Sequence, residues 1–138
     1  MTFIFLSHNS IGQKDRIDSL IKWLDNSQVA LGGDFAGPEV SFIGEPSMSI
    51  YNIGKEATKS LVMILDDSSK GIIAHIILTW IWEKTERPKT ILIEKDTITV
   101  YTYNKLNFFV RRKEIYANKR DLTINKIFWQ DFLKENSR

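Results

Sequence analysis

The chain contains no cysteine, and this absence removes several classes of protein. Disulfide scaffolds, cysteine zinc sites, iron–sulfur clusters and thiol nucleophiles all require that residue. Histidine is also scarce, because the chain has only His8 and His75, far apart in the sequence. We therefore expect no metal site, and any catalysis must depend on Asp, Glu, Ser, Thr, Tyr, Lys or these two histidines.

A long apolar run is missing as well. The longest such stretch, Ile72 to Trp82, is interrupted by His75 and Thr79 and has about half the length that spans a bilayer. No targeting segment opens the chain, so we expect a cytoplasmic protein without a membrane partner. With 138 residues, of which 43% are hydrophobic, the chain suits a single domain over residues 1–138.

The net charge is only +2, but it is unevenly distributed. Residues 1–104 hold 10 Lys and Arg against 13 Asp and Glu, whereas residues 105–138 hold 9 against 4. A basic end can bind nucleic acid. This one is interspersed with Phe108, Phe109 and Trp129, which favours a solvated face over buried aromatic rings. We therefore do not expect nucleic acid to be a partner.

Hydrophobic patterning predicts alternating strands and helices. The strands are expected at residues 2–6, 29–31, 61–65, 90–93 and 97–103. The helices are expected at residues 13–25, 46–58, 71–87 and from about 123 onward. Residues 32–46 are expected to form a loop, and 105–120 give no clear pattern. This order predicts an α/β fold: a flavodoxin-like, three-layer open sheet, mostly parallel, with four to five strands and helices on both faces.

Polar segments follow three of the predicted strands, at residues 7–10, 32–45 and 66–69. In a parallel sheet they would meet at one edge, where ligands bind. The glycine patterns that cradle phosphate are missing. Asp66 and Asp67 could hold magnesium in a receiver-like domain, or they could simply cap a turn.

One polar segment belongs to a longer motif. Residues 4–10, Ile-Phe-Leu-Ser-His-Asn-Ser, stand before an amphipathic helix and resemble the first strand and loop of bacterial TIR (Toll/interleukin-1 receptor) domains. Asp34 resembles the acidic residue that ends the second strand of that family. Residues 44–47 resemble the close of its BB loop, and residues 50–65 resemble its next helix and third strand. The resemblance covers about residues 3–94.

The resemblance implies a domain of a bacterial or phage-related immune or signalling system that cleaves NAD. A glutamate of the family orients the ribose and stabilises positive charge as the glycosidic bond breaks. In the ungapped alignment this position is His75, whereas a shifted alignment uses Glu83. The candidate catalytic residues are therefore Glu83 and His75. The candidate NAD-binding residues are Ser7, His8, Asn9, Asp34, Gly44, Glu45 and Ser69.

Two alternatives remain open. Because a neutral imidazole cannot replace a carboxylate, the chain could be a catalytically degenerate module that associates with itself or with other TIR domains. The apolar helix at 72–82 agrees with self-association, and equally with a fully covered core helix. Residues 68–71, Ser-Ser-Lys-Gly, also resemble a turn of the nucleoside 2-deoxyribosyltransferases, which implies an N-glycosidase or transferase.

Overall fold

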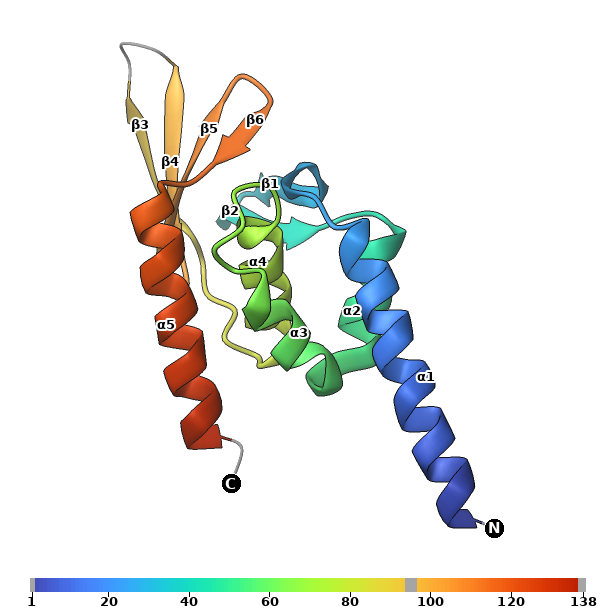
Figure 1. Cartoon of the computed structure of the whole chain (residues 1–138). Helices are drawn as coiled ribbons and strands as arrows, with labels where there is room; N and C mark the ends of the chain where they lie inside the picture. The colour runs from blue at the N-terminus through green and yellow to red at the C-terminus, as the bar shows by residue number, and fades with distance from the viewer. Residues whose placement is uncertain (1, 94–96, 137–138) are drawn as a thin grey trace.

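A computed structural model describes residues 2–93 and 97–136 of the chain, with side chains from residue 12 onward (Figure 1). Its helices are α1 (Thr2–Lys22), α2 (Glu45–Ile53), α3 (Thr58–Met63), α4 (Gly71–Ile81) and α5 (Lys119–Asn136). Its strands are β1 (Val29–Asp34), β2 (Gly37–Phe42), β3 (Lys89–Ile93), β4 (Ile98–Tyr103), β5 (Leu106–Arg111) and β6 (Glu114–Tyr116). Short 3-10 turns occupy Asn26–Gln28 and Gly54–Ala57.

The strands form two separate antiparallel sheets. One is the β1–β2 hairpin, and the other has four strands in the order β3-β4-β5-β6. The prediction of a mostly parallel, flavodoxin-like sheet is therefore wrong, and the fold is mixed α+β. The physical reason lies in the connections. Asn104 and Lys105, both with positive φ, join β4 to β5 in a two-residue turn, which only antiparallel strands allow.

Two predicted strands are helical instead. Residues 2–6 form the start of α1, and residues 61–65 belong to α3 and the turn after it. A short apolar run does not by itself distinguish a strand from a buried helix. In the second case Ala57, Leu61 and Leu65 are spaced four residues apart and all are fully buried, which is the pattern of one helix face.

Helix α4 occupies the centre of the protein. Ten of its eleven residues are buried, and it packs against α2, α3, β1 and β2. Figure 1 shows α1 and α5 on opposite sides of this central group of helices. The all-round apolarity of residues 72–82 is thus explained by a covered core helix. Among the described residues, no helix has both the length and the apolarity needed to cross a membrane.

Polar contacts attach α1 to this centre. Lys70, just before α4, donates through Nζ to the carbonyl oxygens of Ile21, Lys22 and Leu24 at 3.1, 3.1 and 2.6 Å. A cation at this position satisfies free carbonyl groups and interacts favourably with the helix dipole. Asn26 accepts from the backbone N–H of Ile73 at 3.0 Å, which fixes the start of α4.

Candidate functional site

His75 joins three elements of the core. It is completely buried in α4. Its Nδ1 accepts from the indole N–H of Trp129 on α5 at 2.9 Å, and because that indole can only donate, Nε2 carries the proton. Nε2 donates to the carbonyl oxygen of Tyr103 on β4 at 2.8 Å. Burial lowers the pKa of His75 to about 4, although the contact with Tyr103 opposes the shift. The imidazole is therefore neutral, and both of its nitrogens are engaged in the core.

Glu83 lies at the end of the same helix and is exposed. Its backbone has a φ of 54°, in the left-handed region. The N–H of Glu83 donates to Trp80 O at 3.2 Å, and that of Lys84 donates to Thr79 O at 2.8 Å. These are the bonds of a Schellman motif, in which glycine is the favoured residue at the left-handed position.

Replacing Glu83 by glycine is therefore expected to stabilise the fold by about 0.5–1 kcal/mol, because glycine adopts this φ without steric cost. Thermal unfolding would show it as a higher Tm. Lys84→Gly is the matched control, since Lys84 lacks a positive φ and glycine only adds chain entropy to the unfolded state. A lower Tm for Glu83→Gly than for the unmodified protein would contradict this account.

Asp34 and Ser69 are each engaged in a local turn. The Asp34 carboxylate accepts from the N–H of Ala36 at 2.7 Å, between β1 and β2. Ser69 donates through its N–H and its hydroxyl to the Asp67 carboxylate, each at 2.7 Å, and this lowers the pKa of Asp67. Among the described residues, no group of three or more His, Asp and Glu is placed to hold a metal ion.

The other predicted binding residues lie on two further elements. Gly44, with a φ of 97°, precedes α2, and Glu45 is the first residue of that helix. Ser7, His8 and Asn9 lie within α1, and their side chains are outside the described residues. Within the part of the chain whose side chains are described, no recorded hydrogen bond or ion pair joins two of the predicted site residues. The structure thus distributes them over several elements rather than bringing them to one sheet edge.

A cleft of about 400 Å³ lies between β2 and the segment that joins α4 to β3. Its lining includes Glu39, Trp80, Glu86, Arg87 and Tyr103. Burial raises the pKa of Tyr103 to about 12, and the negative charge of Glu86 adds to the shift. The phenol therefore stays protonated at neutral pH. Of the predicted site residues whose side chains are described, none lines this cleft.

The outer face of the four-stranded sheet carries a row of apolar side chains. Its register aligns Ile91, Val100, Phe109 and Tyr116 directly across the four strands, and we call these residues the outer row. Directly paired residues project from the same face of a sheet. The rings of Phe109 and Tyr116 stack with centroids 5.3 Å apart. Ile91 is 66% exposed and Tyr116 is 38% exposed, so the row faces solvent.

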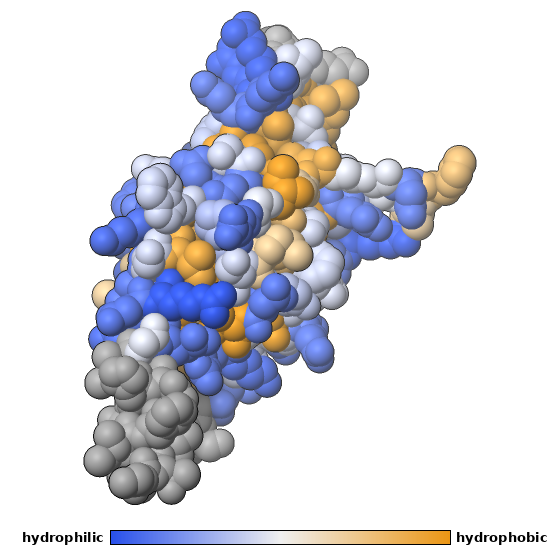
Figure 2. Space-filling view, turned by 90° about the vertical axis from the view of Figure 1, so that its right-hand side faces the viewer, coloured by the Kyte–Doolittle hydropathy of each residue, from blue (hydrophilic) through white to orange (hydrophobic). Residues whose placement is uncertain are grey.

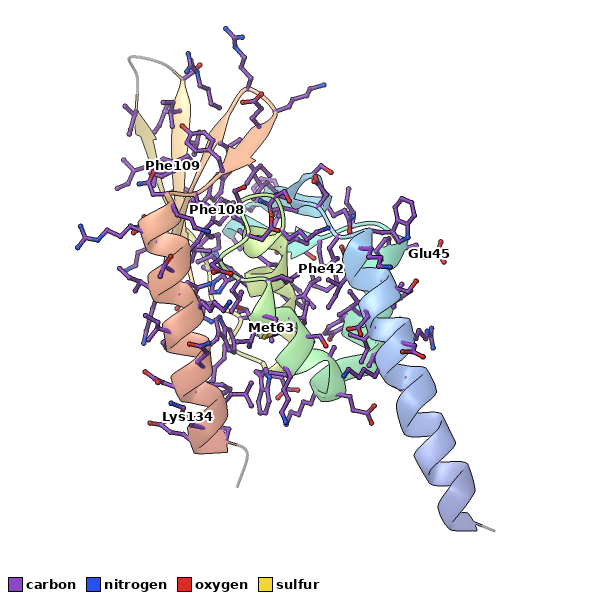
Figure 3. The ribbon with its side chains drawn as sticks, viewed as in Figure 1. Phe42, Glu45, Met63, Phe108, Phe109 and Lys134 are labelled. Atoms are coloured by element: carbon purple, nitrogen blue, oxygen red, sulfur yellow. The ribbon has the colours of Figure 1, made fainter. Side chains whose placement is uncertain are left out.

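The opposite face of this sheet belongs to the core. Tyr103, Leu106 and Phe108 are buried there, and Tyr101 stacks on Phe108. Figure 3 labels Phe108 and Phe109, which are neighbours on β5. Phe108 is fully buried and Phe109 only partly, because successive strand residues point to opposite faces. The apolar character of the outer row is therefore not required by the core.

Strand β3 is a free edge of this sheet, because within the described residues it pairs only with β4. All five of its residues are exposed, including Leu92 at 65%. Lys89 is its only charged residue. The other edge, β6, is only three residues long and includes Glu114. Short or charged edges resist pairing, whereas an exposed apolar edge strand is a template for another strand.

Exposed apolar side chains also occur on other elements. Figure 2 shows apolar patches, in orange, between polar ones over one face of the molecule. Outside the four-stranded sheet, the large exposed apolar residues include Trp23, Phe35, Met63, Ile124 and Ile127. Single exposed apolar residues are normal on protein surfaces. What distinguishes β3 is that exposed apolar side chains and an unpaired backbone edge coincide there.

Two features of the sequence indicate this surface. Along β4, Ile98 and Val100 are apolar on the outer side, although Tyr101 and Tyr103 already serve the core side. Along β5, Phe109 is the apolar residue on the outer side, between Asn107 and Arg111. Residues 105–120 have no clear hydrophobic period, but Asn104-Lys105 and Arg112-Lys113 separate the strand segments at the spacing of two-residue hairpin turns. Reading those pairs as two-residue turns would have predicted the hairpins.

A function for this chain has to be proposed from the geometry of its surface and its cleft. The candidate surface is the outer row together with the free edge of β3, and the candidate cleft is separate from it. The TIR resemblance, with the NAD-cleaving activity that it implies, stays a prediction from the sequence. No protein family, no curated protein and no solved structure matches the chain.

Proposed function

We propose that this protein is a self-associating interaction module in which β3 pairs with β3 of a second copy of the chain. The observation that carries the proposal is that all five residues of β3 are exposed while one edge of the strand has no partner in the described part of the chain. An edge of this kind supplies main-chain hydrogen bonds to an added strand, and its side chains supply specificity.

A second copy fits this edge by symmetry. In an antiparallel two-fold arrangement centred on Ile91, that residue faces its own counterpart and Lys89 faces Ile93 of the other copy. No like charges are opposed, which favours the pairing. The two outer rows then join into one apolar row across eight strands. Isologous contacts of this kind are typical of homodimers.

The energetics indicate a weak association. Burying an isoleucine side chain contributes about 1.5–3 kcal/mol, and each copy offers Ile91 and Ile93 at the contact. Association costs on the order of 4–15 kcal/mol in lost freedom. Because a five-residue edge buries less area than a standard protein interface, we expect a dissociation constant in the range of tens to hundreds of micromolar.

Replacing Ile91 by aspartate is expected to abolish dimerisation, because it places a desolvated charge at the two-fold centre. Sedimentation equilibrium from micromolar to millimolar protein would show a monomer–dimer equilibrium for the unmodified chain and a monomer for the variant. Ile127→Asp on α5 is the matched control, since Ile127 is 52% exposed and lies outside the sheet. It should dimerise like the unmodified chain.

Two outcomes would contradict the proposal. One is an unmodified chain that stays monomeric at millimolar concentration. The other is a dimer that Ile91→Asp and Ile127→Asp weaken equally. Circular dichroism of both variants verifies that they are folded. Amide hydrogen exchange gives a second readout, because dimerisation should protect amides of β3 at high protein concentration.

Cleavage of NAD through Glu83 is a separate proposal, supported by the sequence resemblance. Glu83 is the exposed member of the candidate catalytic pair. Glu83→Gly tests it, because this variant is expected to remain folded. Nicotinamide released by the unmodified protein and lost in the variant would support catalysis by Glu83. Nicotinamide release that is absent, or equal in both proteins, would contradict it.

A further inference from the structure

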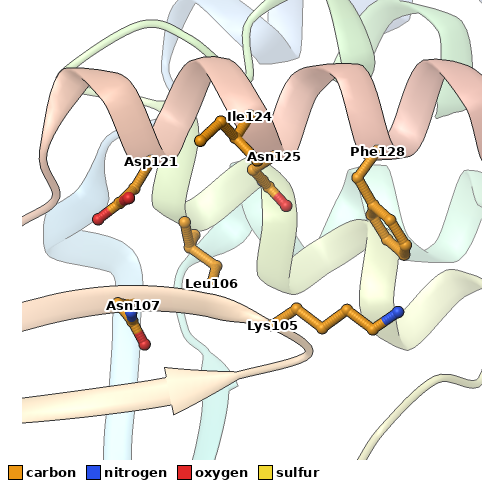
Figure 4. Close-up of a pocket in the computed structure, with 7 residues that line it drawn as sticks. All are labelled: Lys105, Leu106, Asn107, Asp121, Ile124, Asn125 and Phe128. Carbon is orange, nitrogen blue, oxygen red and sulfur yellow. The ribbon is translucent and has the colours of Figure 1, made fainter.

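Helix α5 covers only one face of the four-stranded sheet. A pocket of about 160 Å³ lies between α5 and the turn that joins β4 to β5 (Figure 4). In this view Leu106 points toward α5, whereas the next residue, Asn107, points away from it. Leu106 is buried and Asn107 is exposed. Because alternate strand residues share a face, Asn107 and the outer row belong to a face that α5 does not cover.

Two aromatic rings lie on this uncovered face. Phe109 and Tyr116 belong to the outer row, and the angle between their stacked ring planes is 19°. Phe109 is partly exposed, and Tyr116 is 38% exposed. The core side of the same strands already has its own stacked pair, Tyr101 and Phe108. The rings of Phe109 and Tyr116 are therefore presented to solvent rather than used by the core.

Positive charge adjoins these rings. Residues 105–113 include four Lys and Arg and no Asp or Glu. Arg111 projects from the same face as Phe109, two residues and about 7 Å further along β5. Arg112 and Lys113 form the turn that leads to β6, and all three cations are exposed. No ion pair that involves them is recorded in the described part of the chain, so they are available to an anionic ligand.

We propose that this face binds single-stranded nucleic acid. A base stacks on the ring of Tyr116, which Phe109 supports from its other side, while phosphates of the same strand pair with Arg111 and with the cations of the turn. Rings of this kind accept any base, because every base has a flat π-face, and cations along the strand attract its phosphates.

Two earlier points bear on this proposal. The expectation that nucleic acid is not a partner depends on the aromatic rings of the basic end being buried, whereas Phe109 lies on the uncovered face. The residues that would bind belong to β5, β6 and the turn between them, at the opposite side of the sheet from β3. The proposal therefore does not rest on the pairing of β3 with a second copy.

The test measures the fluorescence anisotropy of a labelled oligothymidylate of about eight nucleotides, a length that single-strand-binding folds cover. The unmodified chain is expected to bind with a dissociation constant on the order of 10–100 µM at low salt. Raising the salt from about 50 to about 200 mM should weaken binding by about tenfold or more, because phosphate contacts release counterions. The duplex with the complementary strand should bind several times more weakly, since its bases are already stacked.

Variants of the aromatic pair give the second readout. Tyr116→Ala is expected to weaken binding by about tenfold, because it removes the ring on which a base stacks. Tyr116→Phe keeps the ring and should bind like the unmodified chain. Phe35→Ala is the matched control, since Phe35 is a fully exposed aromatic residue at the turn of the other sheet. Circular dichroism verifies that the Tyr116→Ala variant is folded.

Variants of charge test the phosphate contacts. Arg112→Gln is expected to reduce the slope of the logarithm of the association constant against the logarithm of salt concentration by about 0.7, the value of one phosphate contact. Arg16→Gln removes the same charge from an exposed position of α1 and should leave the slope unchanged. Glu114→Gln should tighten binding, because Glu114 is the acidic residue directly opposite Arg111.

Four results would overturn the proposal. The first is no saturable binding of the oligonucleotide. The second is a duplex that binds as tightly as the single strand, which means that charge alone attracts it. The third is an equal loss of binding in Tyr116→Ala and Phe35→Ala. The fourth is displacement of the oligonucleotide by polyglutamate at equal charge concentration, which makes this a surface for acidic chains in general.

Discussion

Replacing Gly71 by alanine is expected to destabilise the protein by about 1–3 kcal/mol or more, although alanine is the better helix former. Gly71 is the first residue of α4. A Cβ atom there would lie 2.3 Å from the carbonyl oxygen of Leu65 and 3.0 Å from Cδ2 of Leu122. The first contact is with backbone, so relieving it requires α4 to move relative to the turn that follows α3. Such a movement would disturb the packing of the central helix.

The matched control is Gly12→Ala in α1. A Cβ atom at Gly12 would meet nothing within 4 Å, so only the helix propensity acts there. We expect this variant to gain up to about 1 kcal/mol, the difference between glycine and alanine in a helix. Urea unfolding of both variants at neutral pH measures the two changes. Equal shifts for the two variants, or a stabilised Gly71→Ala, would show that α4 does not approach the Leu65 carbonyl closely.

The sequence predicted individual elements better than their arrangement. The strands expected at 29–31, 90–93 and 97–103 are present in β1, β3 and β4, and the helix expected from residue 71 is α4. These segments carry their own signal, since β-branched and aromatic residues favour strands and an apolar run of eleven residues suits a buried helix. Strand direction has no such local signal, because it depends on the length and path of the connection. The turn at Asn104 and Lys105 decides it for β4 and β5.

The candidate surface was less predictable for a related reason. The outer row comes from four strands between residues 91 and 116. Its members align only through the register of three strand pairs. A shift of one residue in any pair would move an apolar side chain to the other face. His75 illustrates the same limit, because its partner Trp129 is 54 residues away. The sequence showed a histidine in an apolar helix but not what it contacts.

Acidification below about pH 6.5 is expected to destabilise the protein through His75. The pKa of His75 is lowered from 6.5 to about 4 in the fold, chiefly by burial. The unfolded chain therefore binds a proton between these two values while the folded chain does not, so stability falls as the pH falls. The full contribution is present above about pH 6.5. The loss accumulates down to about pH 4 and amounts to roughly 3 kcal/mol.

Asp25 and Asp67 affect the stability of the fold in a different pH range. Asp25 and Asp67 also have lowered pKa values, from a reference of 3.8, chiefly because each accepts hydrogen bonds from a serine, Ser27 for Asp25 and Ser69 for Asp67. A group with a lowered carboxyl pKa loses its contribution only as the pH falls below that reference value. Between pH 4.5 and 6.5 the change is therefore assigned to histidine.

The measurement is the free energy of unfolding in urea at a series of pH values between 4.5 and 7.5. His75→Gln is the control variant, because glutamine keeps a polar side chain that does not titrate. Its stability at neutral pH should be lower, since it cannot reproduce both the bond from Trp129 and the bond to Tyr103. Its stability should nevertheless lose most of the slope below pH 6.5. An unmodified protein whose stability is flat between pH 4.5 and 6.5 would mean that His75 is accessible to protons in the fold, and a slope that survives in His75→Gln would mean that it arises elsewhere in the chain.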